Sequence, residues 1–321
     1  MSIFHKFYMI LILQFLKAIN IRKFKLLILK VFEFLPLNKK KIFFTSHYGD
    51  FSDNSKYLYL KMKEDPNYSD YTFKFAVKNK DLLSNKDMIN YDNKLSFYYH
   101  LLTSKTIYFN SWVSFPKRKG QKWIQLWHGY PYKKIFKDIN TFYLTNDIDE
   151  INYKNSNVKK WDMVHSLDRR NTYIFKKLFS NATIIEVPYE KIEWLKTYNK
   201  NKTFKNKILE DLNLDENIKY CLYAPTYRPY PIHIDLNEVK KLVPRGQKLC
   251  IHSHRMLNVC YHNSDDVLFI DELEDVQPLS LICESLITDY SSLRFEFEQL
   301  NREVVLYQPD LELYKQIQGI Y

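Results

Sequence analysis

The segment Glu284–Ser292 (ESLITDYSS) carries the residues whose types and spacing point most directly to chemistry. A short apolar strand pattern runs into Asp289, and the hydroxyl residues Ser291 and Ser292 precede a helical pattern over 293–300. The first N–H groups of a helix lack partners and the helix dipole there favours an anion, so this helix start suits a phosphate group. A serine at a helix start is more often only a cap, and that interpretation stays open.

The elements that must position these residues form two series of strands that alternate with helical stretches, which is typical of parallel α/β sheets. Two domains are also the natural expectation for 321 residues, and we place a boundary in the polar, basic stretch 196–214. The expected strands cover 41–46, 72–77, 105–109, 123–127, 163–166 and 183–187 in the first series, and 220–224, 248–252, 267–270, 285–288 and 304–307 in the second.

Unusual polar residues gather where the predicted strands end, in both halves of the chain. Open α/β sheets bind ligands at the carboxyl ends of their strands, so two such domains would face each other across a binding cleft. The groups at strand ends are Ser46–Gly49, His128 with Gly129, Thr226–Arg228, His252–His254 and Asp289–Ser292.

The composition excludes some function classes. The chain has only 5 glycines and contains neither GxGxxG nor GxxxxGK[ST], so a glycine-rich nucleotide loop is not expected. Residues 1–41 hold nine Lys and Arg against one acidic residue, which is +8 of the net charge of +11 and leaves the rest of the chain nearly neutral. Proteins that bind nucleic acid carry a basic face on the folded domain, so no nucleic-acid partner is predicted.

The basic N-terminal arm, residues 1–40, is also apolar. Its two runs, Phe7–Leu16 and Phe24–Leu35, are each shorter than the ~20 residues needed to cross a bilayer. No small-residue cleavage site follows the first run, as a signal peptide would require. We therefore expect two helices that lie on an anionic membrane surface, with a pair of core helices as the alternative.

The four cysteines form no CxxC pair, and we expect buried free thiols in a reducing compartment. Cys250, His252 and His254 alternate along a predicted strand and so share a face, and Cys260 and His262 follow. Such ligands could bind zinc, but their spacing matches no standard zinc pattern. No metal site is predicted.

Five segments carry a resemblance to a known family. In chain order they are IFFTSHYGDFSDNSKYLY (Ile42–Tyr59), WIQLWHGYPYKK (Trp123–Lys134), LYAPTYRP (Leu222–Pro229), IHSH (Ile251–His254) and ESLITDYSSLRFEF (Glu284–Phe297). Together they resemble the CDP-glycerol glycerophosphotransferases, which are teichoic-acid-type polymerases and primases. The similarity spans about Lys41 to the end of the chain.

The resemblance implies a GT-B-like α/β fold, in which two Rossmann-like parallel-sheet domains face a cleft. Residues 41–205 would form the acceptor-side domain, and residues 206–321 the domain that binds the CDP donor. It also implies transfer of glycerol phosphate from CDP-glycerol, a substrate rather than a tightly bound cofactor, to a hydroxyl of a lipid-linked acceptor. CMP would be released in teichoic-acid or capsule-type polymer synthesis, at the cytoplasmic face of the cell membrane. Peripheral attachment there agrees with the basic apolar arm.

Under this resemblance His128 is expected to be the general base. Imidazole titrates near working pH, and Gly129 allows a substrate to approach closely; a structural histidine is the alternative. His254 would act near the donor's phosphates from the other domain. Arg228 offers a forked cation that suits a phosphate, with a surface ion pair as the alternative.

The remaining site residues divide between donor and acceptor. Ser291 and Ser292 are expected to hold the pyrophosphate, with Thr226 nearby. Asp289 is expected to orient the loop or a donor hydroxyl, because two anions repel. The acceptor-side candidates are Gly49, Asp53 and Gly129.

Three departures from the family pattern keep alternatives open. Glu186–Lys191 (EVPYEK) stands where the family has Gly-Tyr-Pro-Arg-Asn-Asp, and Glu296 replaces an Asp. The chain also stops at Tyr321, shortly after the last predicted strand, where a GT-B fold adds helices that return to the first domain. The alternatives are a truncated, catalytically inactive membrane-bound relative and a CDP-ribitol-dependent transferase. The residues do not separate a primase from a polymerase.

Overall fold

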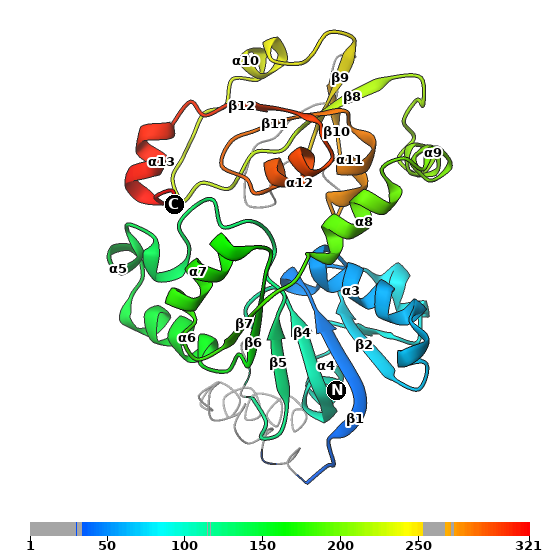
Figure 1. The fold of residues 1–321 in the computed structure, drawn as a ribbon, viewed down its shortest axis with the longest axis vertical. Coiled ribbons are helices and arrows are strands. Elements are labelled where there is room, and N and C mark those ends of the chain that lie inside the picture. The colour runs from blue at the N-terminus through cyan, green and yellow to red at the C-terminus, as the bar shows by residue number, and fades with distance from the viewer. Residues whose placement is uncertain (1–29, 31–33, 114, 116, 253–266, 271–272) are drawn as a thin grey trace, which may run out of the picture.

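The computed structural model describes residues 30, 34–113, 115, 117–252, 267–270 and 273–321. Over these residues the strands form two parallel sheets that lie in separate halves of the molecule (Figure 1). In spatial order, the first sheet comprises β3 (Met88–Asn90), β2 (Thr72–Val77), β1 (Asn38–Thr45), β4 (Ser104–Phe109), β5 (Lys122–Gln125), β6 (Met163–Ser166) and β7 (Thr183–Glu186). The second comprises β10 (Val267–Phe269), β9 (Gln247–Ile251), β8 (Lys219–Tyr223), β11 (Ser285–Thr288) and β12 (Glu303–Leu306).

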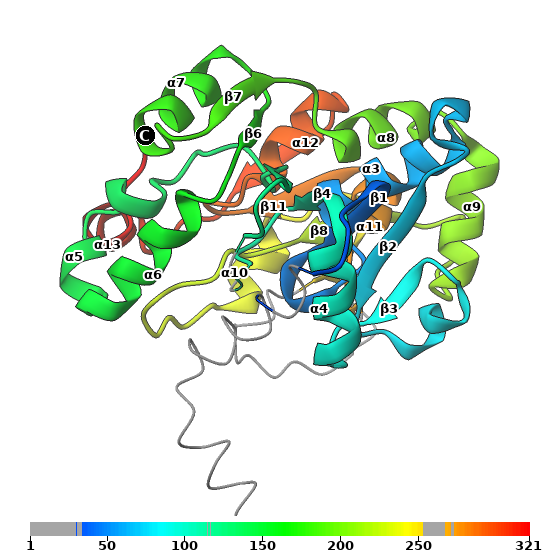
Figure 2. The ribbon, with the colours of Figure 1, turned by 90° about the horizontal axis from the view of Figure 1, so that it is seen from below.

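Helices flank both sheets and connect their strands (Figures 1 and 2). Those of the first half are α3 (Asp53–Glu64), α4 (Lys94–Thr103), α5 (Phe142–Thr145), α6 (Ile148–Val158) and α7 (Arg169–Leu178). The later helices are α8 (Glu190–Tyr198), α9 (Lys202–Asp211), α10 (Leu236–Lys241), α11 (Gln277–Ile282), α12 (Leu293–Gln299) and α13 (Leu311–Ile317). Short 3-10 turns cover His47–Gly49, Pro66–Tyr68, Lys80–Ser84 and Phe136–Asp138.

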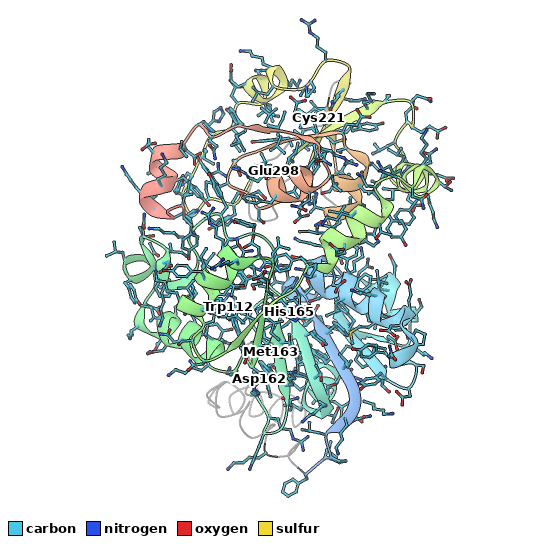
Figure 3. The ribbon with its side chains drawn as sticks, in the orientation of Figure 1. Trp112, Asp162, Met163, His165, Cys221 and Glu298 are labelled. Carbon is cyan, nitrogen blue, oxygen red and sulfur yellow. The ribbon has the colours of Figure 1, made fainter. Side chains whose placement is uncertain are left out.

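The sheets form because their strands are apolar on both faces. In β1, Phe43 and Phe44 point to opposite sides and are both fully buried, each in a separate hydrophobic cluster. In β8, Cys221 and Leu222 likewise point to opposite sides of the sheet and pack in separate hydrophobic clusters (Cys221 is labelled in Figure 3). The expected buried free thiols are confirmed for Cys221, Cys250 and Cys283.

The order of the strands indicates where each sheet is expected to bind a ligand. In the first sheet β1 pairs with both β2 and β4, and in the second β8 pairs with both β9 and β11. The strand order reverses at these positions, and open α/β sheets bind ligands just outside the carboxyl ends of the strands there. Every predicted strand overlaps an observed one. The sequence pattern missed only β3, a three-residue edge strand.

The connection between the halves runs through α8 and α9. Within α8, Ile192 packs in a core of the first half, whereas Leu195 packs in a core of the second. Ile208 and Leu209 of α9 are buried in that second core as well. The polar stretch is therefore largely helical, with a few apolar side chains turned inward. The chain changes cores inside α8, ahead of residue 205.

The end of the chain returns to the first half. The N–H of Lys134 donates to the carbonyl oxygen of Gly319 (2.9 Å), and the N–H of Tyr321 donates to that of Tyr132 (3.0 Å). The Tyr321 hydroxyl donates to Asp138 (3.0 Å). The C-terminus accordingly lies beside α7 in both ribbon views (Figures 1 and 2). The last residues of the chain thus contact the first half.

The expected membrane-surface helices, within residues 1–40, fall mostly outside the described residues. Among the helices within the described residues, none combines the length and the apolar composition that a bilayer-spanning helix needs.

Candidate active site

A cavity of about 510 Å³ lies between the two halves, at the carboxyl ends of both sheets. The first half contributes residues that follow β1 and β5, and the second half contributes residues that follow β8 and β11. The structure thereby brings together most of the predicted site. The predicted residues that line this cavity are Asp53, His128, Gly129, Thr226, Ser291 and Ser292. His254 lies outside the described residues, and its expected role stays a prediction.

Gly129 and Ser292 bring the two halves into close contact. A Cβ atom on Gly129 would lie 2.1 Å from the hydroxyl oxygen of Ser292, which is far inside van der Waals contact. The glycine is therefore required for the contact between the halves, in addition to any contact with substrate. Ser291 differs from Ser292, which is the N-cap residue of α12 but makes no side-chain cap bond: the Ser291 hydroxyl accepts from the N–H of Leu293 (3.2 Å).

Gly49 lies outside the cavity lining. Its φ of +93° is in the left-handed region, and a Cβ there would come within 2.6 Å of the Tyr91 ring. Its carbonyl oxygen accepts from the N–H of Lys78 (2.7 Å). Gly49 thus shapes the turn after β1, and the structure does not bring it to the site.

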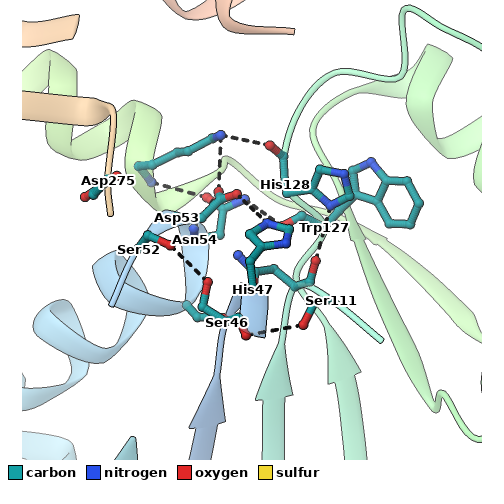
Figure 4. Close-up of polar contacts among 12 residues, drawn as sticks. Ser46, His47, Ser52, Asp53, Asn54, Ser111, Trp127, His128 and Asp275 are labelled. Carbon is teal, nitrogen blue, oxygen red and sulfur yellow. Dashed lines mark hydrogen bonds and ion pairs between the residues drawn. The ribbon is translucent and has the colours of Figure 1, made fainter. Parts of the chain in front are cut away.

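His128 is oriented from two sides. Its Nδ1 lies 3.2 Å from the carbonyl oxygen of Asn110, so Nδ1 carries the proton and Nε2 is the acceptor nitrogen of the ring. The Trp127 ring stacks on the imidazole at 4.9 Å between centroids. The φ of Trp127 is +59°, a strained value, and the Asn54 amide donates to its carbonyl oxygen (3.1 Å). Figure 4 shows His128 beside His47, whose ring centroid lies 5.2 Å away.

The electrostatic environment keeps His128 neutral. His128 is an exposed residue, although many protein atoms surround its imidazole from both halves. This desolvation, followed by the neighbouring His47, lowers the pKa of His128 to about 3, although Asp53 opposes the shift. Above that pH the ring is uncharged and the lone pair of Nε2 is available, although a nitrogen with a lowered pKa is a weaker base than an ordinary imidazole.

Lys191 lies at the centre of the site, although the sequence reasoning did not select it. Its side chain is 5% exposed, and its ammonium lies 2.8 Å from Glu296 Oε1 and 3.2 Å from Asp53 Oδ1. It also donates to the carbonyl oxygen of His128 (2.9 Å). Asp53 in turn lies 3.4 Å from His47 Nε2. One ammonium thus connects the starts of α3 and α8, the end of β5 and helix α12.

The charges of this network follow from the contacts. Burial lowers the pKa of Lys191, but Asp53 and Glu296 raise it more, so Lys191 stays charged. Burial raises the pKa of Asp53, but Lys191 and His47 hold it below its usual range. Burial raises the pKa of Glu296 despite the opposing effect of Lys191. Lys191 belongs to the EVPYEK segment, so this departure from the family pattern contributes a cation to the site.

Arg228 is not placed as expected. Its guanidinium contacts Asp310 at 3.0 and 3.1 Å, pairs with Asp289 and donates to the carbonyl oxygen of Thr226 (2.6 Å). It lies over the Tyr290 ring and outside the cavity lining. Two carboxylates occupy its fork, so Arg228 makes a buried ion pair rather than the surface ion pair given as the alternative. Asp289 accepts from the N–H of Thr226 at 3.0 Å and so holds the loop.

The zinc alternative gains no support over the described residues, in which no three potential ligands are grouped. Cys250 is buried in the second half's core. The Nδ1 atom of His252 lies 2.8 Å from the carbonyl oxygen of Ile270. The other candidate ligands fall within 253–266, outside the described residues.

Comparison with known proteins decides the family. Residues 27–321 match the family described as CDP-Glycerol:Poly(glycerophosphate) glycerophosphotransferase. The chain belongs to this family of transferases. It is 31% identical to a teichoic acid poly(glycerol phosphate) polymerase of Bacillus spizizenii, over 92% of this chain and 80% of that protein. It is 28% identical to a teichoic acid glycerol-phosphate transferase of Staphylococcus aureus, over 91% of this chain and 80% of that protein.

Solved structures confirm the GT-B-like fold. The wall teichoic acid polymerase TagF superposes with a TM-score of 0.79 at 24% identity, over 96% of this chain and 81% of that one. A TagF variant soaked with CDPG superposes with a TM-score of 0.78 at 26% identity. The match covers 92% of this chain and 78% of the TagF chain.

We predict that Lys191→Met destabilises the protein, because it leaves two carboxylates buried without their cation. Breaking a buried ion pair from one side costs about 3–5 kcal/mol of unfolding free energy. The matched control is Lys196→Met, an exposed lysine of the same helix, which should change that energy by less than about 0.5 kcal/mol. Denaturant unfolding measures both. Equal stability of the two variants would contradict the network.

We predict that Arg228→Met also lowers the unfolding free energy, by about 3–5 kcal/mol, since Asp289 and Asp310 lose their common partner. Arg245→Met, at an exposed position, is the control. If Arg228 instead holds a phosphate, its variant will keep the stability of the control and lose only affinity for CDP-glycerol.

Proposed function

We propose that this chain transfers glycerol phosphate from CDP-glycerol to a hydroxyl of a lipid-linked acceptor and releases CMP, in teichoic-acid-type polymer synthesis. Family membership and the relatives that are teichoic acid polymerases and transferases support the substrate and the reaction. The observation that carries the proposal is the position of His128, which lines the cavity between the halves together with hydroxyl groups of the opposite half.

The chemistry follows from these positions. The acceptor oxygen forms a bond to the phosphorus that bears glycerol, and the bond from that phosphorus to the CMP oxygen breaks. The bonding electrons leave with CMP, and the acceptor proton passes to Nε2 of His128. Since the carbonyl oxygen of Asn110 holds Nδ1, the ring presents the correct nitrogen without tautomer exchange. Phosphoryl transfer otherwise depends on positioning and charge neutralisation.

The donor would be held by groups at the strand ends of the second half. Ser291, Ser292 and Thr226 line the cavity and offer hydroxyl groups to the diphosphate. Because Arg228 is occupied, we assign neutralisation of the diphosphate to Lys133, which also lines the cavity. Burial lowers the pKa of Lys133, with Asp289 opposing that shift, and a bound anion would favour its charged form. Lys133 belongs to the WIQLWHGYPYKK segment, so the motif contained this signal.

We further propose that the arm, residues 1–40, attaches the enzyme to the anionic cytoplasmic face of the cell membrane. Its concentration of basic residues and its short apolar runs support a peripheral location near a lipid-linked acceptor.

We predict that His128→Ala lowers kcat by about 10²–10⁴-fold, the contribution of a positioned base, and leaves the Kd of CDP-glycerol nearly unchanged. The donor groups come from other residues, so binding should persist. CMP release and calorimetry measure the two quantities, and His233→Ala, at an exposed position, is the control.

Two results would count against this assignment. Joint loss of folding and donor binding in His128→Ala would make His128 structural. Absence of CMP release by the wild-type chain, from both CDP-glycerol and CDP-ribitol with membrane acceptor, would favour the inactive relative. Release from CDP-ribitol alone would favour the ribitol transferase.

We predict that high salt or an alkaline wash releases the protein from membranes, because the arm would bind lipid mainly through charge and shallow burial. Western blotting of the washed membranes checks this. Extraction by detergent alone would show that attachment is not peripheral.

A further inference from the structure

A second cavity, of about 630 Å³, lies in the first half and adjoins the cavity between the halves. Both cavities are lined by His47, Tyr48, Trp127 and His128, so the proposed base stands where they meet. The donor site described above uses only the first cavity. The second has a wall of different chemistry.

Aromatic rings dominate this wall. Tyr98 and Phe115 pack with their centroids 4.3 Å apart, and Trp112 and Trp161 lie 5.5 Å apart. Trp112 is 40% exposed and lies near the carboxyl end of the first sheet (Figure 3). Exposed indole surface in a cavity is suited to the C–H face of a sugar ring, whose slight positive charge is attracted to the π-cloud.

Asn110 supplies a second, independent observation. Asn110 is fully buried and lines the cavity. Neither the nitrogen nor the oxygen of its side-chain amide has a hydrogen-bond partner among the described residues. A buried polar group without a protein partner is able to hydrogen-bond to a ligand hydroxyl or a water molecule. The amide can both donate and accept, which matches a hydroxyl group, whereas a phosphate oxygen only accepts. The backbone carbonyl of the same residue holds His128.

The charged groups of the cavity favour a neutral ligand. Lys154 is paired with Glu150 at 3.1 Å and donates to Asn146 at 2.7 Å. Lys94 donates to the carbonyl oxygen of Tyr91 (3.0 Å) and lies over the ring of that residue. Among the described lining residues none is an arginine. A chain of phosphates would find its potential cations already engaged.

We propose that the second cavity binds the acceptor through a neutral sugar ring, which stacks on the aromatic wall and hydrogen-bonds to Asn110. An acceptor hydroxyl then lies at His128, opposite the donor. This assignment rests on the proposed function and names the class of acceptor: an acceptor with a sugar ring near the attacking hydroxyl, rather than the end of a glycerol-phosphate chain.

Saturation-transfer NMR on the full chain tests this without donor, using a panel of methyl pyranosides of hexoses and N-acetylhexosamines, and sn-glycerol 3-phosphate. At least one pyranoside should bind saturably and more tightly than glycerol 3-phosphate. Trp112→Leu should weaken that binding by about five- to tenfold. Tyr173→Leu, which removes an exposed aromatic ring outside the cavity, should leave it unchanged. Asn110→Leu retains the backbone carbonyl and provides a second variant, also expected to weaken binding.

The outcomes separate this inference from the proposed function. The proposed sugar site is wrong if no pyranoside binds to the chain. It is also wrong if Trp112→Leu and Asn110→Leu bind the pyranoside as tightly as the Tyr173→Leu control does. Preferential binding of glycerol 3-phosphate would overturn it as well. CMP release from CDP-glycerol is measured separately, so the transferase assignment can fail while pyranoside binding stands, or the reverse.

Discussion

The buried ammonium of Lys191 is the interaction on which the arrangement of the site depends. It contacts Asp53 at the start of α3, Glu296 in α12 and the carbonyl oxygen of His128. Two buried carboxylates would repel each other in a medium that screens charge poorly, and only a shared cation allows them to lie in one place. The two halves of the molecule and the proposed base therefore share a single ion-pair network.

The second constraint is the strain at the end of β5. Trp127 takes a left-handed backbone conformation, which turns the chain so that its ring stacks on His128 while Gly129 contacts the opposite half. The Asn54 amide stabilises that turn through the Trp127 carbonyl oxygen. Such strain persists only where the surrounding contacts determine it, and here the result is an imidazole with a fixed tautomer, placed where two cavities meet.

The sequence predicted the strands well, because buried parallel strands are apolar on both faces and polar residues follow where they end. It also placed His128 and Ser292 in one cleft, since the carboxyl ends of parallel strands meet at one edge. It could not predict that Arg228 pairs with Asp289 and Asp310. Both acidic residues lie more than sixty positions further along the chain, and only the fold brings them to Arg228. Lys191 was missed for a related reason: its segment departs from the family pattern, and only the fold shows that the new side chain reaches two carboxylates.

The most direct test of this account is the pH dependence of kcat/KM for CDP-glycerol, which reports the ionisation of the free enzyme. With the pKa of His128 at about 3, the base is uncharged from pH 8 down to pH 5, and protonation removes it only as the pH falls toward 3. The account therefore predicts no acidic limb near pH 6.5, the ordinary value for histidine. A loss of rate with an apparent pKa near 6.5, present in the wild type and absent from the residual activity of His128→Ala, would contradict it.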